Sequence, residues 1–103
     1  MTKLMPADFD PFFEKSTALL LHMANANRLA VLQALVDGET SVGVLAVKLG
    51  LSAPALSQHL SRLRTAKLVE ARRNAQNVFY SCTSPEVSKV LLALASLSQV
   101  KHI

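Results

Sequence analysis

Apolar residues recur at intervals of three and four along most of this chain, which is the spacing of one face of an α-helix. The pattern predicts helices over residues 12–24, 27–36, 41–49, 52–66 and 85–100. Pro6 and Pro11 come before the first helix, so residues 1–10 are expected to form a loose N-terminal arm. With no internal repeat and one short stretch of strand pattern, residues 1–103 are predicted to form a single, mostly α domain.

Residues that start or stop helices stand at most of these boundaries. Asn25, Ser41 and Ser52 are placed to cap the second, third and fourth helices, because their short side chains accept bonds from free backbone N–H groups. Gly38 follows the second helix, where we expect it to end the helix in the left-handed conformation. Gly50 lies just past the end of the third helix, at the start of a turn. The third and fourth helices are thus separated only by a tight turn.

The fourth predicted helix has one apolar side and one polar side. Leu56, Leu60 and Leu63 fall on one stripe and are expected to point into the core. The opposite side carries hydrogen-bonding groups, one cation and no acid, from Pro54, Ser57, Gln58, Ser61, Arg62 and Thr65. Such a surface suits the major groove of DNA, which is polyanionic and rich in hydrogen-bonding groups. Residues 41–66 are therefore predicted to form a helix-turn-helix.

After the fourth helix, the period of the apolar positions becomes that of a β-strand. Residues 68–82 are predicted to form two short strands, joined by a polar hairpin turn at 74–77. Arg72 and Arg73 come just before the turn. A basic hairpin after a helix-turn-helix is a wing, which lies along the phosphate backbone or enters the minor groove.

The first and last predicted helices are apolar on more than one side. Half of all residues are hydrophobic and the mean hydropathy is +0.30, yet a domain of this size has little interior in which to cover that surface. We therefore expect both helices to pair two copies of the chain as a homodimer. The residues assigned to this interface are Phe12, Phe13, Leu20, Leu91, Leu94 and Leu97.

Positive charge is concentrated in the middle of the chain, although the net charge is only +4. Residues 40–80 hold six lysines and arginines and one acid, a net charge of +5, whereas residues 1–39 carry a net charge of −2. A localised basic patch is the usual electrostatic sign of nucleic-acid binding. On charge alone, the alternative is an ordinary solvated basic face.

The sequence offers little support for catalysis or for a membrane span. Three histidines, one cysteine and one tyrosine show no nucleophile–base spacing, and no Gly-rich phosphate loop is present, so we expect neither an enzyme nor a cofactor. No apolar run approaches the roughly 18 residues of a membrane span, and the N-terminus lacks a signal-peptide pattern. Cys82 is the single cysteine, which fits a reducing cytoplasm.

Three short motifs occur in a characteristic order. Residues 23–29 enter the second helix, residues 51–60 read Leu-Ser-Ala-Pro-Ala-Leu-Ser-Gln-His-Leu, and residues 72–80 run from Arg-Arg to Val-Phe-Tyr in the wing. Together they resemble the ArsR/SmtB family of winged-helix repressors over residues 17–97. The wording of the second and third motifs is closest to the NolR/HlyU-like branch of that family.

The resemblance implies a winged helix-turn-helix of four helices, a hairpin and a last helix, acting as a homodimeric repressor on an imperfect palindrome in double-stranded DNA. The DNA contacts that we assign on this basis are Ser52, Ala55, Ser57, Gln58, His59, Ser61, Arg62, Arg64, Arg72, Arg73, Gln76 and Asn77. Gln58 is the first candidate for a base contact, because glutamine bonds adenine in a bidentate way. His59 has a second interpretation as a packed residue at the core edge, and Ser57 and Ser61 as solvent-exposed side chains.

The sensor residues that the family usually carries are missing. Relatives that sense metal on the third helix use a Cys-x-Cys, and Ser41 and Gly43 occupy the matching positions. The last helix has neither the Asp nor the His of other metal sensors, and the cysteine pair of dithiol sensors is absent as well. We therefore expect no metal site, and interpret Cys82 as a structural thiol with a redox role as the alternative. Lys67, where the family often has glycine, and Pro54 are further departures.

Two other functions stay open at this point. A winged-helix module can use the same surface for protein contacts. A repressor can also be gated by an unidentified small ligand, and the space between the first and last helices is then the candidate site.

Overall fold

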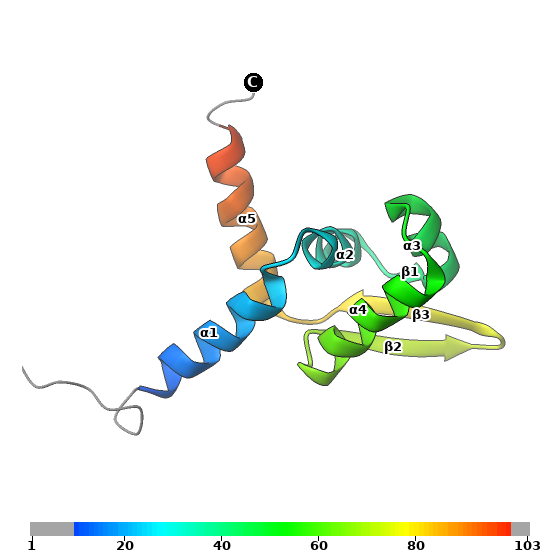
Figure 1. Cartoon of the computed structure of the whole chain (residues 1–103), viewed down its shortest axis with the longest axis horizontal. Helices are drawn as coiled ribbons and strands as arrows, with labels where there is room; N and C mark the ends of the chain where they lie inside the picture. Colours follow the sequence, from blue (N-terminus) through cyan, green and yellow to red (C-terminus); the bar gives the residue numbers. More distant parts are fainter. Residues whose placement is uncertain (1–9, 100–103) are drawn as a thin grey trace, which may run out of the picture.

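The computed structural model describes residues 10–99, which contain five helices and three strands. In chain order the elements are α1 (Pro11–Met23), α2 (Ala26–Asp37), β1 (Thr40–Ser41), α3 (Val42–Leu49), α4 (Ala53–Thr65), β2 (Val69–Asn74), β3 (Asn77–Cys82) and α5 (Pro85–Gln99) (Figure 1). The predicted order of four helices, a hairpin and a last helix is confirmed. The predicted N-terminal arm falls almost entirely outside the described residues, as does Val100 at the end of the predicted last helix.

All three predicted N-caps are confirmed. The side-chain oxygen of Asn25 accepts a bond from the Arg28 N–H at 3.0 Å, that of Ser41 from Val44 at 3.3 Å, and that of Ser52 from Ala55 at 3.2 Å. Each of these caps contributes roughly 1 kcal/mol by satisfying a backbone donor that has no partner within its helix. The start of the helix-turn-helix and the start of its second helix are therefore fixed by local chemistry.

The two glycines that follow helices behave differently. Gly50 lies just past the end of α3 as predicted, and its φ of 65°, together with the bond from the N–H of Leu51 to the carbonyl of Ala46 at 3.0 Å, makes it a left-handed helix ending. The prediction for Gly38 is wrong, because its φ is 165°, an extended backbone that any residue adopts. The chain leaves α2 in this extended form because it runs directly into β1.

A short third strand was not predicted. The sheet is antiparallel in the order β1-β3-β2, with Thr40 opposite Tyr80 and Ser41 opposite Phe79. Two residues are too few to show an alternating pattern, and β1 directly precedes a helix. The main hairpin agrees with the prediction, since Asn74 pairs with Asn77 around a two-residue turn.

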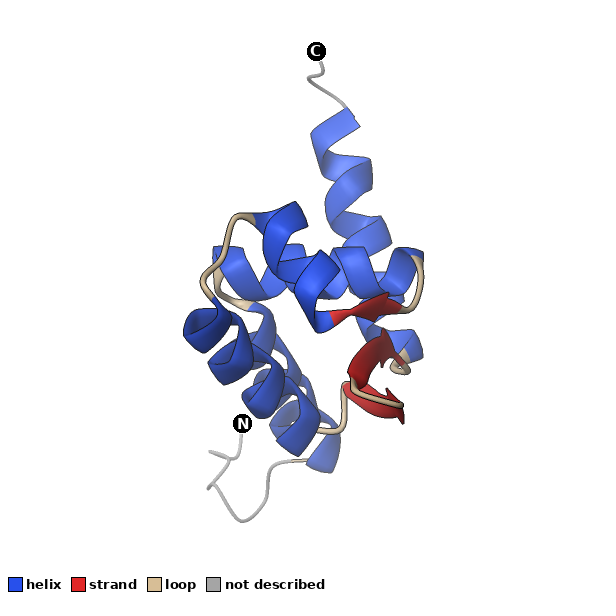
Figure 2. Ribbon diagram, turned by 90° about the vertical axis from the view of Figure 1, so that its right-hand side faces the viewer, coloured by secondary structure: helices blue, strands red, loops and turns tan. Residues whose placement is uncertain are grey.

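The core lies between the helices and one face of the sheet. Leu56, Leu60 and Leu63 of α4 are buried as predicted, and they belong to the same core cluster as Leu32 of α2 and Val87 of α5. Figure 2 shows the strands lying at one side of the helices. Because the leucines of α4 point into this core, the polar side of the helix faces outward.

Arg28 joins α1 to α2. Its Nε donates to the carbonyl of His22 at 2.7 Å and its Nη2 to that of Leu21 at 3.4 Å. These carbonyls belong to the last turn of α1, where no helical partner is available. The bonds therefore hold the sharp bend between the two helices, which is 98°.

Apolar side chains remain exposed on α1 and α5. Those assigned to pairing that are exposed are Phe12, Phe13, Leu20, Leu94 and Leu97. Leu91 is different, since it is only 8 % exposed and belongs to the subunit's own core, whereas its neighbour Leu92 is 70 % exposed. The assignment of Leu91 to the pairing surface is corrected accordingly, because that turn of α5 packs on the core. The C-terminal half of α5 extends away from the other elements in both Figure 1 and Figure 2.

Candidate nucleic-acid interface

The outer side of α4 is an exposed polar surface. Ser57, Gln58, Ser61 and Arg62 are all exposed, as the helical spacing requires. Among the residues that the structure describes, none of these four side chains makes a hydrogen bond or an ion pair, so their polar groups are free to meet a ligand. Ser52 is exposed at the start of the same helix, where its hydroxyl accepts from Ala55 and can still donate its own proton.

Two of the assigned residues of α4 lie at the edge of this surface. Ala55 and His59 are partly buried, and Nδ1 of His59 is buried with no hydrogen-bond partner among the described residues. Burial lowers the pKa of the His59 imidazole below its usual value, and the charges of Arg28 and Arg62 lower the pKa further. The neutral form is therefore favoured, and the interpretation of His59 as a packed residue is the one that agrees with its position.

The hairpin places a second group of polar side chains at the end of the molecule where α4 begins. Figure 1 shows the turn between β2 and β3 projecting past the start of α4. Arg73, Gln76 and Asn77 are all exposed on this hairpin, and Arg73 has no ion-pair partner within the described residues. α4 and the wing thus both carry exposed hydrogen-bonding and cationic groups.

Arg72 is held in a way that the sequence did not predict. Its Nη2 lies 2.8 Å from Oε1 of Glu39 and its Nε 3.0 Å from Oε2, and its guanidinium lies 4.9 Å from the centre of the Phe79 ring. The bond from Arg72 lowers the pKa of the Glu39 carboxyl, and the same bond raises the pKa of Arg72. Glu39 was missed because its partner is 33 positions away and is brought close only by β1, the strand that the pattern did not reveal.

The far end of α4 carries two more cations. Arg64 and Lys67 are exposed and line a shallow notch together with Glu70. Twelve residues separate Arg64 from Ser52, which corresponds to about 18 Å along the helix. The structure therefore does not bring Arg64 together with the start of α4. If Arg64 contacts DNA, it does so at a site farther along the duplex than the contacts of Ser52.

Lys67 occupies a left-handed position, with a φ of 64°. Its N–H bonds the carbonyl of Arg64 at 2.9 Å, and the next N–H, from Leu68, bonds that of Leu63 at 3.0 Å. These two bonds are the Schellman ending of a helix, in which glycine is usual at this position. The departure noted in the sequence therefore has a structural meaning, because lysine accepts a conformation that costs L-residues energy.

The structure places Cys82 and the two third-helix positions that correspond to the family's metal ligands within residues 10–99. Cys82 is partly buried, burial raises the pKa of its thiol, and its sulfur lies 4.0 Å from the Ser84 carbonyl. Ser41 serves as the cap of α3, and Gly43 lies exposed on that helix. Over these residues, the structure brings together no group of three or more His, Cys, Asp or Glu side chains suited to a metal ion.

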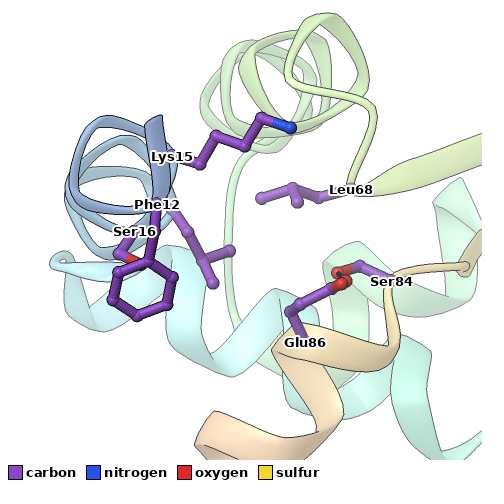
Figure 3. Close-up of a pocket in the computed structure, with 7 residues that line it drawn as sticks. Phe12, Lys15, Ser16, Leu68, Ser84 and Glu86 are labelled. Atoms are coloured by element: carbon purple, nitrogen blue, oxygen red, sulfur yellow. Dashed lines mark hydrogen bonds between the residues drawn. The ribbon is translucent and has the colours of Figure 1, made fainter. Parts of the chain in front are cut away.

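A pocket of about 380 Å³ opens between α1 and the start of α5. Phe12 and Lys15 line it from α1, Leu68 forms part of its wall, and Ser84 and Glu86 lie on the opposite side (Figure 3). The Ser84 hydroxyl donates to Glu86 at 3.1 Å, and bonds from the backbone N–H of Glu86 and from Ser84 lower the pKa of the Glu86 carboxyl. The volume is within the range of small-molecule sites.

None of the single helices between residues 10 and 99 has the length and apolar character needed to cross a membrane. Only α1 and α2 taken together reach that length, and they are sharply bent at the break between them.

Comparison with known proteins identifies the family. A family model described as bacterial regulatory protein, arsR family, matches residues 25–71. The nodulation protein NolR of Rhizobium meliloti is 50 % identical over 84 residues, which cover 82 % of this chain and 69 % of that protein. The transcriptional activator HlyU of Vibrio cholerae is 48 % identical over 83 residues, covering 81 % and 77 % of the two chains.

The fold agrees with the sequence relationship. The crystal structure of NolR from Sinorhizobium fredii matches with a TM-score of 0.85 at 46 % identity, covering 94 % of this chain and 96 % of that one. The resemblance to the NolR/HlyU-like branch is thereby confirmed. The chain belongs to the ArsR family of winged helix-turn-helix transcriptional regulators, which bind DNA and are not enzymes.

Proposed function

We propose that this regulator is a homodimeric repressor that binds an imperfect palindrome in double-stranded DNA. The observation that carries the proposal is the polar side of α4, which is exposed, free of acids and flanked by a cationic wing. Such a surface complements both the charge of the phosphate backbone and the hydrogen-bonding groups of the major groove.

In this proposal α4 is the recognition helix. Gln58 reads a base edge through a bidentate bond, as glutamine does with adenine. Some of the side chains of Ser57, Ser61 and Arg62 contact base edges and others contact phosphates. The Ser52 hydroxyl donates a hydrogen bond to a phosphate at the start of the helix. From the wing, Arg73, Gln76 and Asn77 contact the backbone or the minor groove.

Pairing of two subunits follows from the exposed apolar faces of α1 and α5. Phe12, Phe13 and Leu20 of α1 are exposed to solvent, as are Leu94 and Leu97 of α5. Burying them in a dimer removes apolar surface from water, which drives association. A two-fold dimer then places its two recognition helices about 34–36 Å apart, one turn of DNA.

The proposed repressor works without the family's usual metal or dithiol sensors. The chain has the single Cys82, and the matching positions of the third helix are Ser41 and Gly43. We infer repression from the resemblance to the family's repressors, among them the biofilm growth-associated repressor of Xylella fastidiosa, although the relative HlyU is named an activator.

Binding to a duplex from its own promoter, measured by fluorescence anisotropy over a roughly fourfold range of salt from about 50 mM, tests the proposal. Each phosphate contact contributes about 0.9 to the slope of log affinity against log salt, so several contacts give a steep loss. Binding that is absent or insensitive to salt would instead favour the winged-helix protein-interaction module.

The role of Gln58 has its own test. Gln58→Ala is expected to lose about 1–3 kcal/mol on the operator and to lose its preference at one base pair of each half-site. Gln33→Ala is the matched control, because Gln33 is an exposed glutamine on α2, outside the residues assigned to DNA. If Gln58→Ala keeps both affinity and base preference, then the recognition face has been assigned to the wrong residues.

The pocket between α1 and α5 favours a second candidate function, a repressor gated by a small ligand. Its apolar wall, the Lys15 ammonium and the Glu86 carboxylate suit a small molecule that has an apolar body and polar groups. A metabolite panel screened for a rise in Tm tests this candidate, with Ser16→Phe as the control that fills the pocket. A Tm that no metabolite shifts favours a repressor that acts by its abundance.

A further inference from the structure

The Arg72–Glu39 pair links β2, one outer strand of the sheet, to the residue that directly precedes β1, the other outer strand. Arg72 of β2 lies opposite Phe79 of β3, and Phe79 lies opposite Ser41 of β1, two positions after Glu39. Since β1 and β2 do not bond to each other, the ion pair is a direct link between the strand that enters α3 and the strand that enters the wing. It crosses over the ring of Phe79, on which the guanidinium lies at 4.9 Å.

The geometry of the pair is well defined for a surface contact. Both carboxylate oxygens of Glu39 accept from different nitrogens of Arg72, at 2.8 and 3.0 Å. A bidentate arrangement of this kind fixes the orientation of both groups as well as their separation. The aromatic ring beneath adds a cation–π contact that fixes the same guanidinium from a third side.

The next residue of β2 provides a contrast. Arg73 lies opposite Val78 and therefore points to the other face of the sheet. It is exposed and forms no ion pair with any described residue. The two adjacent arginines thus differ in the face of the sheet that they occupy and in their charge environment, because among residues 10–99 only Arg72 has an ion-pair partner.

We propose that Glu39 is a positioning residue for DNA recognition, which withholds Arg72 from the phosphates and uses it to brace the wing against the helix-turn-helix. The inference rests on the proposed function, because it concerns how the same chain binds DNA. Arg73 then supplies the wing's phosphate contact, and Arg72 supplies none. This assignment replaces the equal roles that the sequence predicts for the two arginines.

The brace has two consequences for binding. A wing that is already held in place loses less conformational freedom on binding, which raises the affinity for the operator. A free Arg72 would add a phosphate contact that carries no sequence information, and would strengthen binding to every sequence alike. Glu39 therefore increases the ratio of specific to non-specific affinity.

Salt titrations of Arg72→Gln and Arg73→Gln, the matched pair, test the proposal on the operator duplex. Arg73→Gln is expected to lower the salt slope by about 0.9 for each phosphate that the variant no longer touches. Arg72→Gln is expected to weaken operator binding by the same factor at every salt concentration, with the slope unchanged. If Arg72→Gln lowers the slope as much as Arg73→Gln does, then Arg72 contacts phosphate and the proposal is overturned.

Glu39→Gln supplies the complementary measurement on a duplex of unrelated sequence. It is expected to raise non-specific affinity and steepen the salt slope, and adding Arg72→Gln to it is expected to abolish both changes. The reversed pair, Glu39→Arg with Arg72→Glu, is expected to regain operator affinity relative to either single change. A salt slope and specificity ratio left unchanged by Glu39→Gln would refute the brace, while wild-type operator binding would still support the proposed repressor.

Discussion

At position 67 the chain uses a lysine where the backbone is left-handed. The two backbone hydrogen bonds that end α4 require a left-handed residue at this position. Lys67 adopts the required φ of 64° as the chain turns into β2, although the conformation is unfavourable for a residue with a side chain. His59 is a second unusual residue, because its Nδ1 atom is buried and has no hydrogen-bond partner among the described residues. Both features lie in or next to α4, the helix that we propose reads DNA.

Replacement of Lys67 by glycine is expected to stabilise the fold. Glycine adopts a positive φ without the steric cost of a side chain, so Lys67→Gly should raise the free energy of unfolding by about 1 kcal/mol. Urea unfolding at one fixed protein concentration measures the change. Lys67→Ala removes the charge but keeps the strain, so it should stay close to the wild type; equal stabilities for the glycine and alanine variants would contradict a backbone origin.

Acid is expected to destabilise the protein through His59. Its pKa is lower in the folded chain than the usual 6.5 of an unfolded one, so the unfolded state binds more protons and stability falls as the pH drops through this region. Unfolding followed from about pH 7.5 down to about pH 5.5 should show the loss, and His59→Gln should reduce it. A pH dependence that His59→Gln leaves unchanged would assign the loss of stability to another group.

At the scale of elements, the predictable parts were those set by local chemistry. The caps at Asn25, Ser41 and Ser52 and the leucine stripe of α4 depend on residues a few positions apart, and all were confirmed. What failed depends on distant partners. β1 exists because β3 pairs with it, and the extended Gly38 follows from the same pairing.

The start of α4 is expected to depend on one hydroxyl. Ser52→Ala removes the acceptor of the Ala55 N–H, which should lower the free energy of unfolding by about 1 kcal/mol and loosen the first turn of the helix. Thermal unfolding measures the stability, and amide exchange at Ala55 measures the loosening. Ser52→Asn retains a capping oxygen and should behave like the wild type; a similar loss in both variants would point away from the cap.

At the scale of the whole molecule, the elements proposed to read DNA and the apolar faces proposed to pair two subunits come from different parts of the chain. α3, α4 and the wing lie in the middle, whereas α1 and α5 come from the two ends. The sequence could locate both groups, because charge and hydropathy are themselves unevenly distributed. It could not separate Leu91 from Leu94, since only the packing of α5 decides which turn of the helix meets the subunit's own core.

Leu94→Lys is expected to split the dimer. Leu94 is 44 % exposed on α5, and a lysine there would place a charge within the proposed apolar contact. Sedimentation should show the mass falling by half. Val47→Lys is the matched control, since Val47 is also an exposed apolar residue but lies on α3; a Leu94→Lys variant that stays dimeric would exclude this part of α5 from the seam.

The exposed faces of α1 and α5 also bear on how much of the protein a cell must make. A lone subunit with Phe12, Phe13 and Leu97 in water is prone to stick to other chains and to be degraded. Below the dissociation constant of the dimer, doubling the supply of subunits raises the dimer about fourfold by mass action. Operator occupancy would then respond steeply to the rate of synthesis, so transcription and turnover of this one gene product could set a threshold with no inducer at all.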